Sequence, residues 1–187
     1  MITIVSGLPR SGTALAMQML EAGGLPLVTD DHARADDDNP LGYFDFEPAK
    51  RTHDDSSWLP VAEGKAVKVM ADNLPFLPAE GYEYKLIFIE RDIREVVASF
   101  YGVLMRKGKK DTKVSEEKLM NDFTTILGEA GKWIAEQHIT ALYLKYHDVI
   151  ENKIREADRI NNFLGGELDT TAMSEAVHSK LYRQRSW

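Results

Sequence analysis

Residues 4–20 read IVSGLPRSGTALAMQML, and this stretch decides the fold that we predict. A buried strand is predicted over residues 2–6 and a helix over residues 13–21, because a short apolar run is followed by apolar positions at helical spacing. Between them, Gly7 and Gly12 bracket a loop with the spacing G-x-x-x-x-G, which is typical of phosphate-binding loops. Such loops hold anions with backbone amides at the N-terminus of a helix. We therefore expect an anion-binding strand–loop–helix unit.

The rest of the chain alternates strand-like and helix-like segments. Strands are predicted over residues 66–70, 85–89 and 139–145, and helices over residues 92–106 and 147–164. Strands that alternate with helices indicate a parallel sheet covered by helices on both faces. We expect a single domain over residues 1–187 with a three-layer α/β fold of the P-loop type. Its ligand site should lie at the carboxyl ends of the strands.

Composition narrows the possible functions. The 187 residues are 43% hydrophobic and 28% charged, as in ordinary globular proteins. A net charge of -7 argues against general nucleic-acid binding, which needs a broad basic surface. The chain has no cysteine, which excludes disulfides and thiolate chemistry, and no apolar stretch long enough to span a bilayer. We expect a cytoplasmic protein with a small-molecule partner and no nucleic-acid or membrane partner.

The loop departs from that of nucleoside triphosphatases at two positions. Thr13 stands where those loops carry lysine, and Ala14 stands where they carry the hydroxyl that binds magnesium. The positive charge lies instead at Arg10, inside the loop. We expect the loop to bind an anion without a metal. A strand–turn–helix junction whose glycines serve only geometry is the alternative, and the fuller Gly-Leu-Pro-Arg-Ser-Gly-Thr string disfavours it.

Residues 9–13, Pro-Arg-Ser-Gly-Thr, resemble the phosphosulfate-binding loop of the sulfotransferase family. That family uses 3′-phosphoadenylyl sulfate (PAPS) as its sulfuryl donor. The resemblance implies that Arg10, Ser11, Gly12 and Thr13 contact the donor, with the backbone amides from Ser11 to Thr13 around its 5′-phosphate. Ala14 departs from the family pattern, in which a further threonine is frequent.

A second match lies near residue 90. Phe-Ile-Glu-Arg-Asp at residues 88–92, followed by Val-Val-Ala-Ser-Phe-Tyr at residues 96–101, resembles the family's strand–Arg–helix–Ser signature. The resemblance implies that Arg91 and Ser99 grip the 3′-phosphate of PAPS. A surface arginine and a serine on a helix face are the alternative. The pairing with the first loop favours the binding role.

The resemblance also implies a catalytic lysine, Lys68, which would contact the transferring sulfuryl group together with Arg10. The cytosolic branch of the family places its general base, a histidine, where this chain has Met70. Since methionine accepts no proton, the base must lie elsewhere, and the candidates are Asp45, Glu47 and His53. We expect apolar neighbours to raise the pKa of Asp45 or Glu47 toward neutrality, and at least one of the three to point toward Arg10 and Lys68.

The function implied is sulfuryl transfer from PAPS, used as a co-substrate without a metal, to an alcohol or amine of a small-molecule acceptor. Two alternatives stay open. One is a P-loop nucleotide kinase or hydrolase, in which Glu90 would end a metal-binding strand. The other is a catalytically silent nucleotide-binding protein, which Met70 favours.

Overall fold

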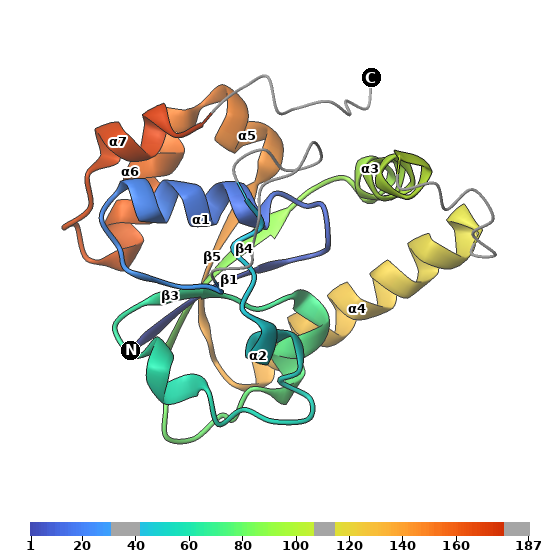
Figure 1. Ribbon diagram of the computed structural model, residues 1–187, viewed down its shortest axis with the longest axis horizontal. Helices are drawn as coiled ribbons and strands as arrows, with labels where there is room; N and C mark the ends of the chain where they lie inside the picture. The colour runs from blue at the N-terminus through green and yellow to red at the C-terminus, as the bar shows by residue number, and fades with distance from the viewer. Residues whose placement is uncertain (31–41, 107–114, 178–187) are drawn as a thin grey trace.

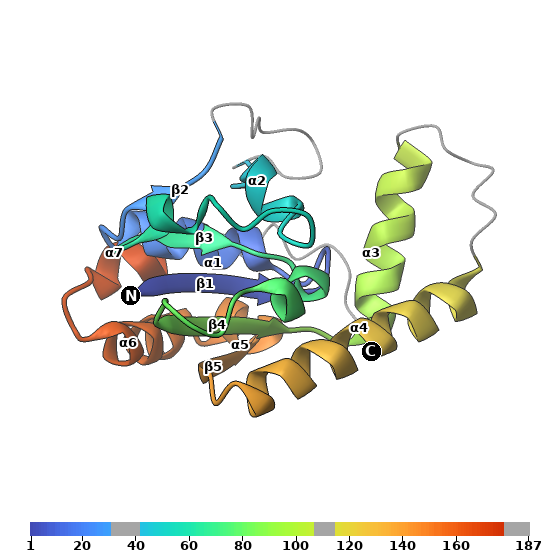
Figure 2. The same cartoon turned by 90° about the horizontal axis from the view of Figure 1, so that it is seen from below.

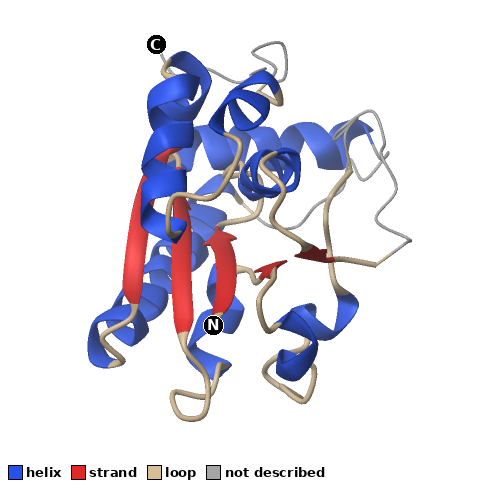
Figure 3. Ribbon diagram, turned by 90° about the vertical axis from the view of Figure 1, so that its left-hand side faces the viewer, coloured by secondary structure: helices blue, strands red, loops and turns tan. Residues whose placement is uncertain are grey.

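A computed structural model, describing residues 1–30, 42–106 and 115–177, shows a five-stranded sheet in which all neighbouring strands are parallel. The spatial order is β2-β3-β1-β4-β5. The strands are β1 (Ile2–Gly7), β2 (Leu27–Val28), β3 (Ala66–Lys68), β4 (Tyr84–Glu90) and β5 (Thr140–Lys145). The three-layer α/β fold expected from the sequence is confirmed (Figures 1 and 3). The central strand β1 is buried throughout, as a continuous apolar strand of a parallel sheet should be.

Helices cover both faces of the sheet (Figure 1). One face carries α1 (Thr13–Ala22), α5 (Tyr146–Glu151), α6 (Lys153–Leu164) and α7 (Thr170–Glu175). The other carries α4 (Glu116–Glu136) and the 3-10 turns η1 (Leu59–Ala62) and η2 (Ala71–Phe76). Most of α1 is buried, because α7 covers the side of α1 that the sheet leaves open. The helices packed on both faces therefore hold the sheet and fix where its strand ends lie.

Helix α3 (Ile93–Arg106) stands beyond the carboxyl ends of the strands and packs on α4 (Figure 2). Leu8 of the first loop, Val96 and Val97 of α3, and Leu119 and Phe123 of α4 form a small separate core there. This core ties the loop after β1 to α3, two segments that are far apart in the sequence. The short helix α2 (Glu47–Lys50) completes the elements before β3.

Most predicted elements are present, with two differences. The helix expected over residues 147–164 is two helices, α5 and α6, separated at Asn152, whose φ of -121° and ψ of 41° are not helical. Asparagine favours such conformations because its side chain competes for backbone hydrogen bonds. The strand expected over residues 66–70 ends at Lys68.

Three parts of the sequence lie outside the described residues: 31–41, 107–114 and 178–187. They include most of the aspartate-rich stretch at residues 29–40 and most of the basic stretch at residues 106–113. Within the described ranges, none of the helices combines the length and apolar character needed to cross a membrane.

Candidate active site

The loop after β1 lies at the carboxyl edge of the sheet and has a backbone that only glycine fits at key points. Gly12 has a φ of 111°, and a Cβ placed there would lie 2.4 Å from Cδ2 of Tyr146. A Cβ at Gly7 would lie 2.6 Å from the Oγ of Ser11 and 2.7 Å from the carbonyl oxygen of Ile89. The glycine spacing noted in the sequence therefore reflects close approach of the loop to β4 and α5.

Two loop side chains are buried at the start of α1. Ser11 is 1% exposed and Thr13 is 5% exposed. The Ser11 hydroxyl has no hydrogen-bond partner among the described residues. Arg10 adopts a φ of 70°, which is uncommon for a residue other than glycine and is frequent at functional sites. The loop thus presents the N-terminus of α1, a buried hydroxyl and a guanidinium at one edge of the sheet.

Arg91 follows the last residue of β4 and joins three elements. Its Nε donates to Oε2 of Glu95 at 2.9 Å, and its Nη1 donates to the backbone carbonyl of Arg10 at 3.1 Å. Its guanidinium carbon lies 4.5 Å from the ring centroid of Tyr146, which is a cation–π contact. The Arg91 and Glu95 side chains are each only 8% exposed. Arg91 is therefore held in one orientation by the loop, α3 and α5.

Ser99 joins the second sequence motif, residues 88–101, to the loop after β1. It is buried on α3, and its Oγ accepts a hydrogen bond of 3.2 Å from Nε of Arg10. Arg10, Arg91 and Ser99 come from three elements, and the contacts that join them span 81 and 89 residues of sequence. The structure thus brings together the two stretches that the sequence singled out separately.

Lys68 ends β3 beside the central strand, paired in register with Val5. It is buried, and its Nζ donates to the backbone carbonyl of Tyr43 and forms an ion pair with Asp45. Asp45 also pairs with Lys50, at 2.8 Å. Burial lowers the pKa of Lys68 below its ordinary value, while the neighbouring Asp45 carboxylate opposes that shift.

The expectation that Asp45 has a raised pKa is wrong. Burial by itself would raise the pKa of Asp45, but the charges and hydrogen bonds of Lys68 and Lys50 outweigh it and leave the pKa below its ordinary value. Asp45 contacts Lys68, one of the two cations toward which a base candidate was expected to point. A carboxylate between two ammonium groups is a weaker base than a free one, because both charges stabilise its ionised form.

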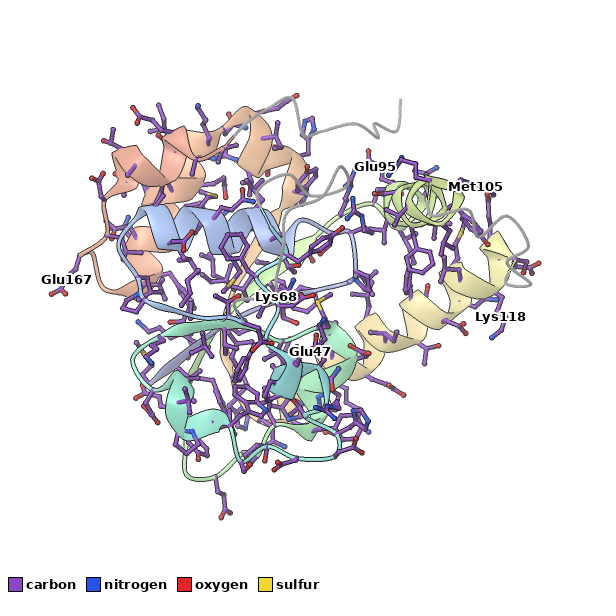
Figure 4. All side chains as sticks on the ribbon, viewed as in Figure 1. Glu47, Lys68, Glu95, Met105, Lys118 and Glu167 are labelled. Carbon is purple, nitrogen blue, oxygen red and sulfur yellow. The ribbon has the colours of Figure 1, made fainter. Side chains whose placement is uncertain are left out.

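The other two base candidates lie differently. Glu47 is exposed at the start of α2, where its carboxylate pairs with Lys50 at 2.6 Å. His53 is also exposed, with Nε2 3.3 Å from Asp54 and Nδ1 3.4 Å from the side-chain oxygen of Asn73. Its ring lies edge-on to Phe76 of η2. Among the three candidates, Asp45 is the one that the structure places on Lys68, and Figure 4 shows Lys68 near the middle of the molecule.

Two residues of this site, Glu95 and Tyr146, were not predicted from the sequence. Glu95, whose position Figure 4 marks, pairs with Arg91 at the helical spacing i, i+4. Tyr146 follows β5 directly, so its position at the carboxyl edge was the signal available. Both border a cavity of about 290 Å³ that is lined by Glu90, Arg91, Asp92, Glu95, Lys145, Tyr146 and His147.

A parallel α/β sheet with a glycine-bracketed loop after its central strand, and Arg91 hydrogen-bonded to the backbone of that loop, is the architecture of P-loop proteins. The sulfotransferase domain family matches residues 2–184, and the chain belongs to this family. Mouse sulfotransferase 1A1 is 25% identical over 203 residues, which cover 97% of this chain and 65% of the mouse protein.

The fold is also found in a solved structure. Retinol dehydratase, crystallised in complex with androsterone and the inactive cofactor PAP, superposes with a TM-score of 0.54 at 18% identity. The match covers 95% of this chain and 63% of that one. The chain thus spans a little under two thirds of the length of each of these two relatives.

Proposed function

We propose that the chain transfers a sulfuryl group from PAPS to an alcohol or amine of a small-molecule acceptor. In this reaction the acceptor oxygen or nitrogen attacks sulfur, and the bond from sulfur to the bridging oxygen breaks. 3′-Phosphoadenosine 5′-phosphate leaves with that oxygen, and the acceptor's proton passes to a base. Membership of the sulfotransferase domain family supports the reaction class.

The observation that carries the proposal is the convergence of Arg10, Arg91 and Ser99 on one loop. In this proposal the backbone amides of residues 11–13 hold the 5′-phosphate at the N-terminus of α1, where the helix dipole favours an anion. Arg91 and Ser99 hold the 3′-phosphate. A donor with phosphates at the 3′ and 5′ positions of its ribose gives a role both to the loop amides and to the pair Arg91 and Ser99. A loop that binds a single phosphate would not need Arg91 or Ser99.

The buried Ser11 hydroxyl also fits an anionic ligand. A buried hydroxyl without a partner costs free energy, and a phosphate oxygen would satisfy it. Arg10 and Lys68 would neutralise the charge that develops on the sulfuryl and bridging oxygens, as electrostatic catalysis requires. The solved structure of retinol dehydratase contains PAP, which supports the choice of donor for a chain with the same fold.

The two alternatives are less well supported. A kinase or hydrolase would lack both the loop lysine and the hydroxyl at position 14. A silent binder would share the donor site, and only turnover separates it from an enzyme. The proposal keeps the cytoplasmic location expected above, which the absence of cysteine permits.

A transfer assay tests the proposal. The full chain is incubated with sulfur-radiolabelled PAPS and a panel of phenols, aliphatic alcohols and amines, and labelled product is separated from donor. Transfer to at least one acceptor without added magnesium is expected. Arg91→Ala should lose donor binding, whereas Arg94→Ala, a change at an exposed arginine three residues away, should not. Hydrolysis of ATP with magnesium, and no transfer from PAPS, would overturn the proposal.

A further inference from the structure

Lys68 is held by one short segment that crosses the end of β3. Among the residues that the structure describes, its two partners both come from residues 42–46: the backbone carbonyl of Tyr43 and the carboxylate of Asp45. We call these two groups the Lys68 clamp. Because both come from the same segment, the position of the Lys68 ammonium depends on how this segment is anchored.

The backbone between Tyr43 and Asp45 directs the carbonyl of one and the carboxylate of the other at the Lys68 ammonium. Phe44, which lies between them, has a φ of 54°, in the left-handed region that residues other than glycine seldom adopt. The carbonyl of Asp45 is anchored by the backbone N–H of Asp30 at 2.9 Å and by the Thr29 hydroxyl at 3.1 Å. Thr29 and Asp30, which follow β2, therefore hold the turn at Phe44. This turn lets the Tyr43 carbonyl and the Asp45 carboxylate face the same Lys68 ammonium.

Two charged groups among the described residues act on the Lys68 ammonium, and they act in opposite directions. Asp45 stabilises the protonated form by its charge and hydrogen bond, whereas Lys50 on α2 destabilises it. Lys50 also shares the Asp45 carboxylate, at 2.8 Å. A lysine as buried as Lys68 would otherwise tend to lose its proton, since burial disfavours the charged form. Its charge therefore depends on burial, which favours the neutral form, and on the balance between these two neighbours.

We infer that Asp45 is a positioning residue that keeps Lys68 protonated and aimed, and that it is not the general base of the reaction. This inference rests on the proposed function for the role of Lys68 at the sulfuryl group. A carboxylate committed to two cations is poorly suited to take a proton, but it is well suited to hold a buried cation ready for an anionic donor. When the donor arrives, the charge it meets has already been desolvated and oriented.

Replacing Asp45 and replacing Lys50 should shift the titration of Lys68 in opposite directions. Asp45→Asn should move the titration of Lys68 to lower pH, because it removes the stabilising charge. Lys50→Gln should move the titration to higher pH, because it removes the opposing charge and leaves Asp45 to Lys68 alone. Asp45→Glu should restore most of the wild-type behaviour. The matched control is Asp122→Asn, which removes a carboxylate from an exposed ion pair with Lys118 on α4.

Two measurements on the same variants test it. In the first, the ε-carbons of the lysines are labelled with carbon-13 and the Lys68 signal, assigned from a Lys68→Met variant, is followed by NMR as pH rises. The second is the pH profile of turnover. At alkaline pH, Asp45→Asn should turn over at least about tenfold more slowly than wild type, because the active protonated form of Lys68 is depleted. Its acid limb should persist.

The outcomes are separable. An unchanged or higher titration midpoint for Lys68 in Asp45→Asn overturns the inference, whether or not any transfer is detected. So does loss of the acid limb with an unchanged Lys68 titration, because that result makes Asp45 the general base. If Asp45→Asn does not fold, the Lys50→Gln variant provides the test. A shift of the Lys68 titration to lower pH in that variant contradicts the inference. Absence of transfer in the wild type, with donor binding intact, contradicts only the proposed function.

Discussion

Removing Arg91 should destabilise the fold because it leaves the buried Glu95 carboxylate without this cation. The variant Arg91→Met keeps the volume of the side chain and removes its charge. The Glu95 side chain is 8% exposed and lies 2.9 Å from Nε of Arg91. Removing one member of a buried ion pair lowers the free energy of unfolding by about 3–5 kcal/mol. The lost hydrogen bond to the Arg10 carbonyl adds about 1 kcal/mol.

The double variant Arg91→Met with Glu95→Leu separates the two contributions. Replacing both members of a buried pair by apolar groups of similar volume is frequently close to neutral, so the double variant should regain all but about 1–2 kcal/mol. Urea denaturation of the wild type, both single variants and the double variant measures the coupling between the two sites. Equal destabilisation of the single and the double variant would refute the reasoning, because the cost would then not come from the loss of the Arg91 charge beside Glu95.

Three further predictions concern other parts of the site. Gly12→Ala should unfold at lower urea than Gly24→Ala: both glycines have positive φ, but only at Gly12 does the new Cβ collide with Tyr146, and equal midpoints would contradict the clash. The pKa of Asp45 lies below its unfolded value, so its contribution to stability is present above that unfolded value and is lost as pH falls through the folded one. Urea midpoints should therefore fall less on acidification in Asp45→Asn than in wild type, and parallel curves would count against the ion pair. Lys68→Ala should lower the turnover number by about a hundredfold or more while changing donor binding less, and an intact turnover number would remove Lys68 from catalysis.

The fold and the glycine-bracketed loop after β1 could be predicted because their signals are local. Residues 2–20 contain an apolar strand, two glycines at a fixed spacing and about the first two turns of a helix. Arg91 and Ser99 were predicted near that loop from the family resemblance, and for Arg91 the fold supplies a geometric reason. Strands of a parallel sheet end at the same edge, so a residue directly after β4 must lie near one directly after β1.

The surroundings of Lys68 could not be predicted in the same way. The segment of residues 42–46 has no periodic pattern, and its path depends on hydrogen bonds to Thr29 and Asp30 and on the unusual φ of Phe44. The sequence indicated aromatic neighbours that would raise the pKa of Asp45, but it carried no sign that two lysines would share the carboxylate. The two-residue strand β2 was also too short to leave a pattern.

The central claim is that Arg91 and Ser99 recognise a 3′-phosphate. Isothermal titration of the full chain, without magnesium, with 3′-phosphoadenosine 5′-phosphate and with AMP tests it most directly, because the two ligands differ by that phosphate alone. One charge-assisted contact, worth about 1.5–3 kcal/mol, corresponds to a preference for the bisphosphate of about tenfold to somewhat over a hundredfold. The preference should shrink in Ser99→Ala and persist in Arg94→Ala. Equal affinities of the wild-type chain for the two nucleotides would contradict the account.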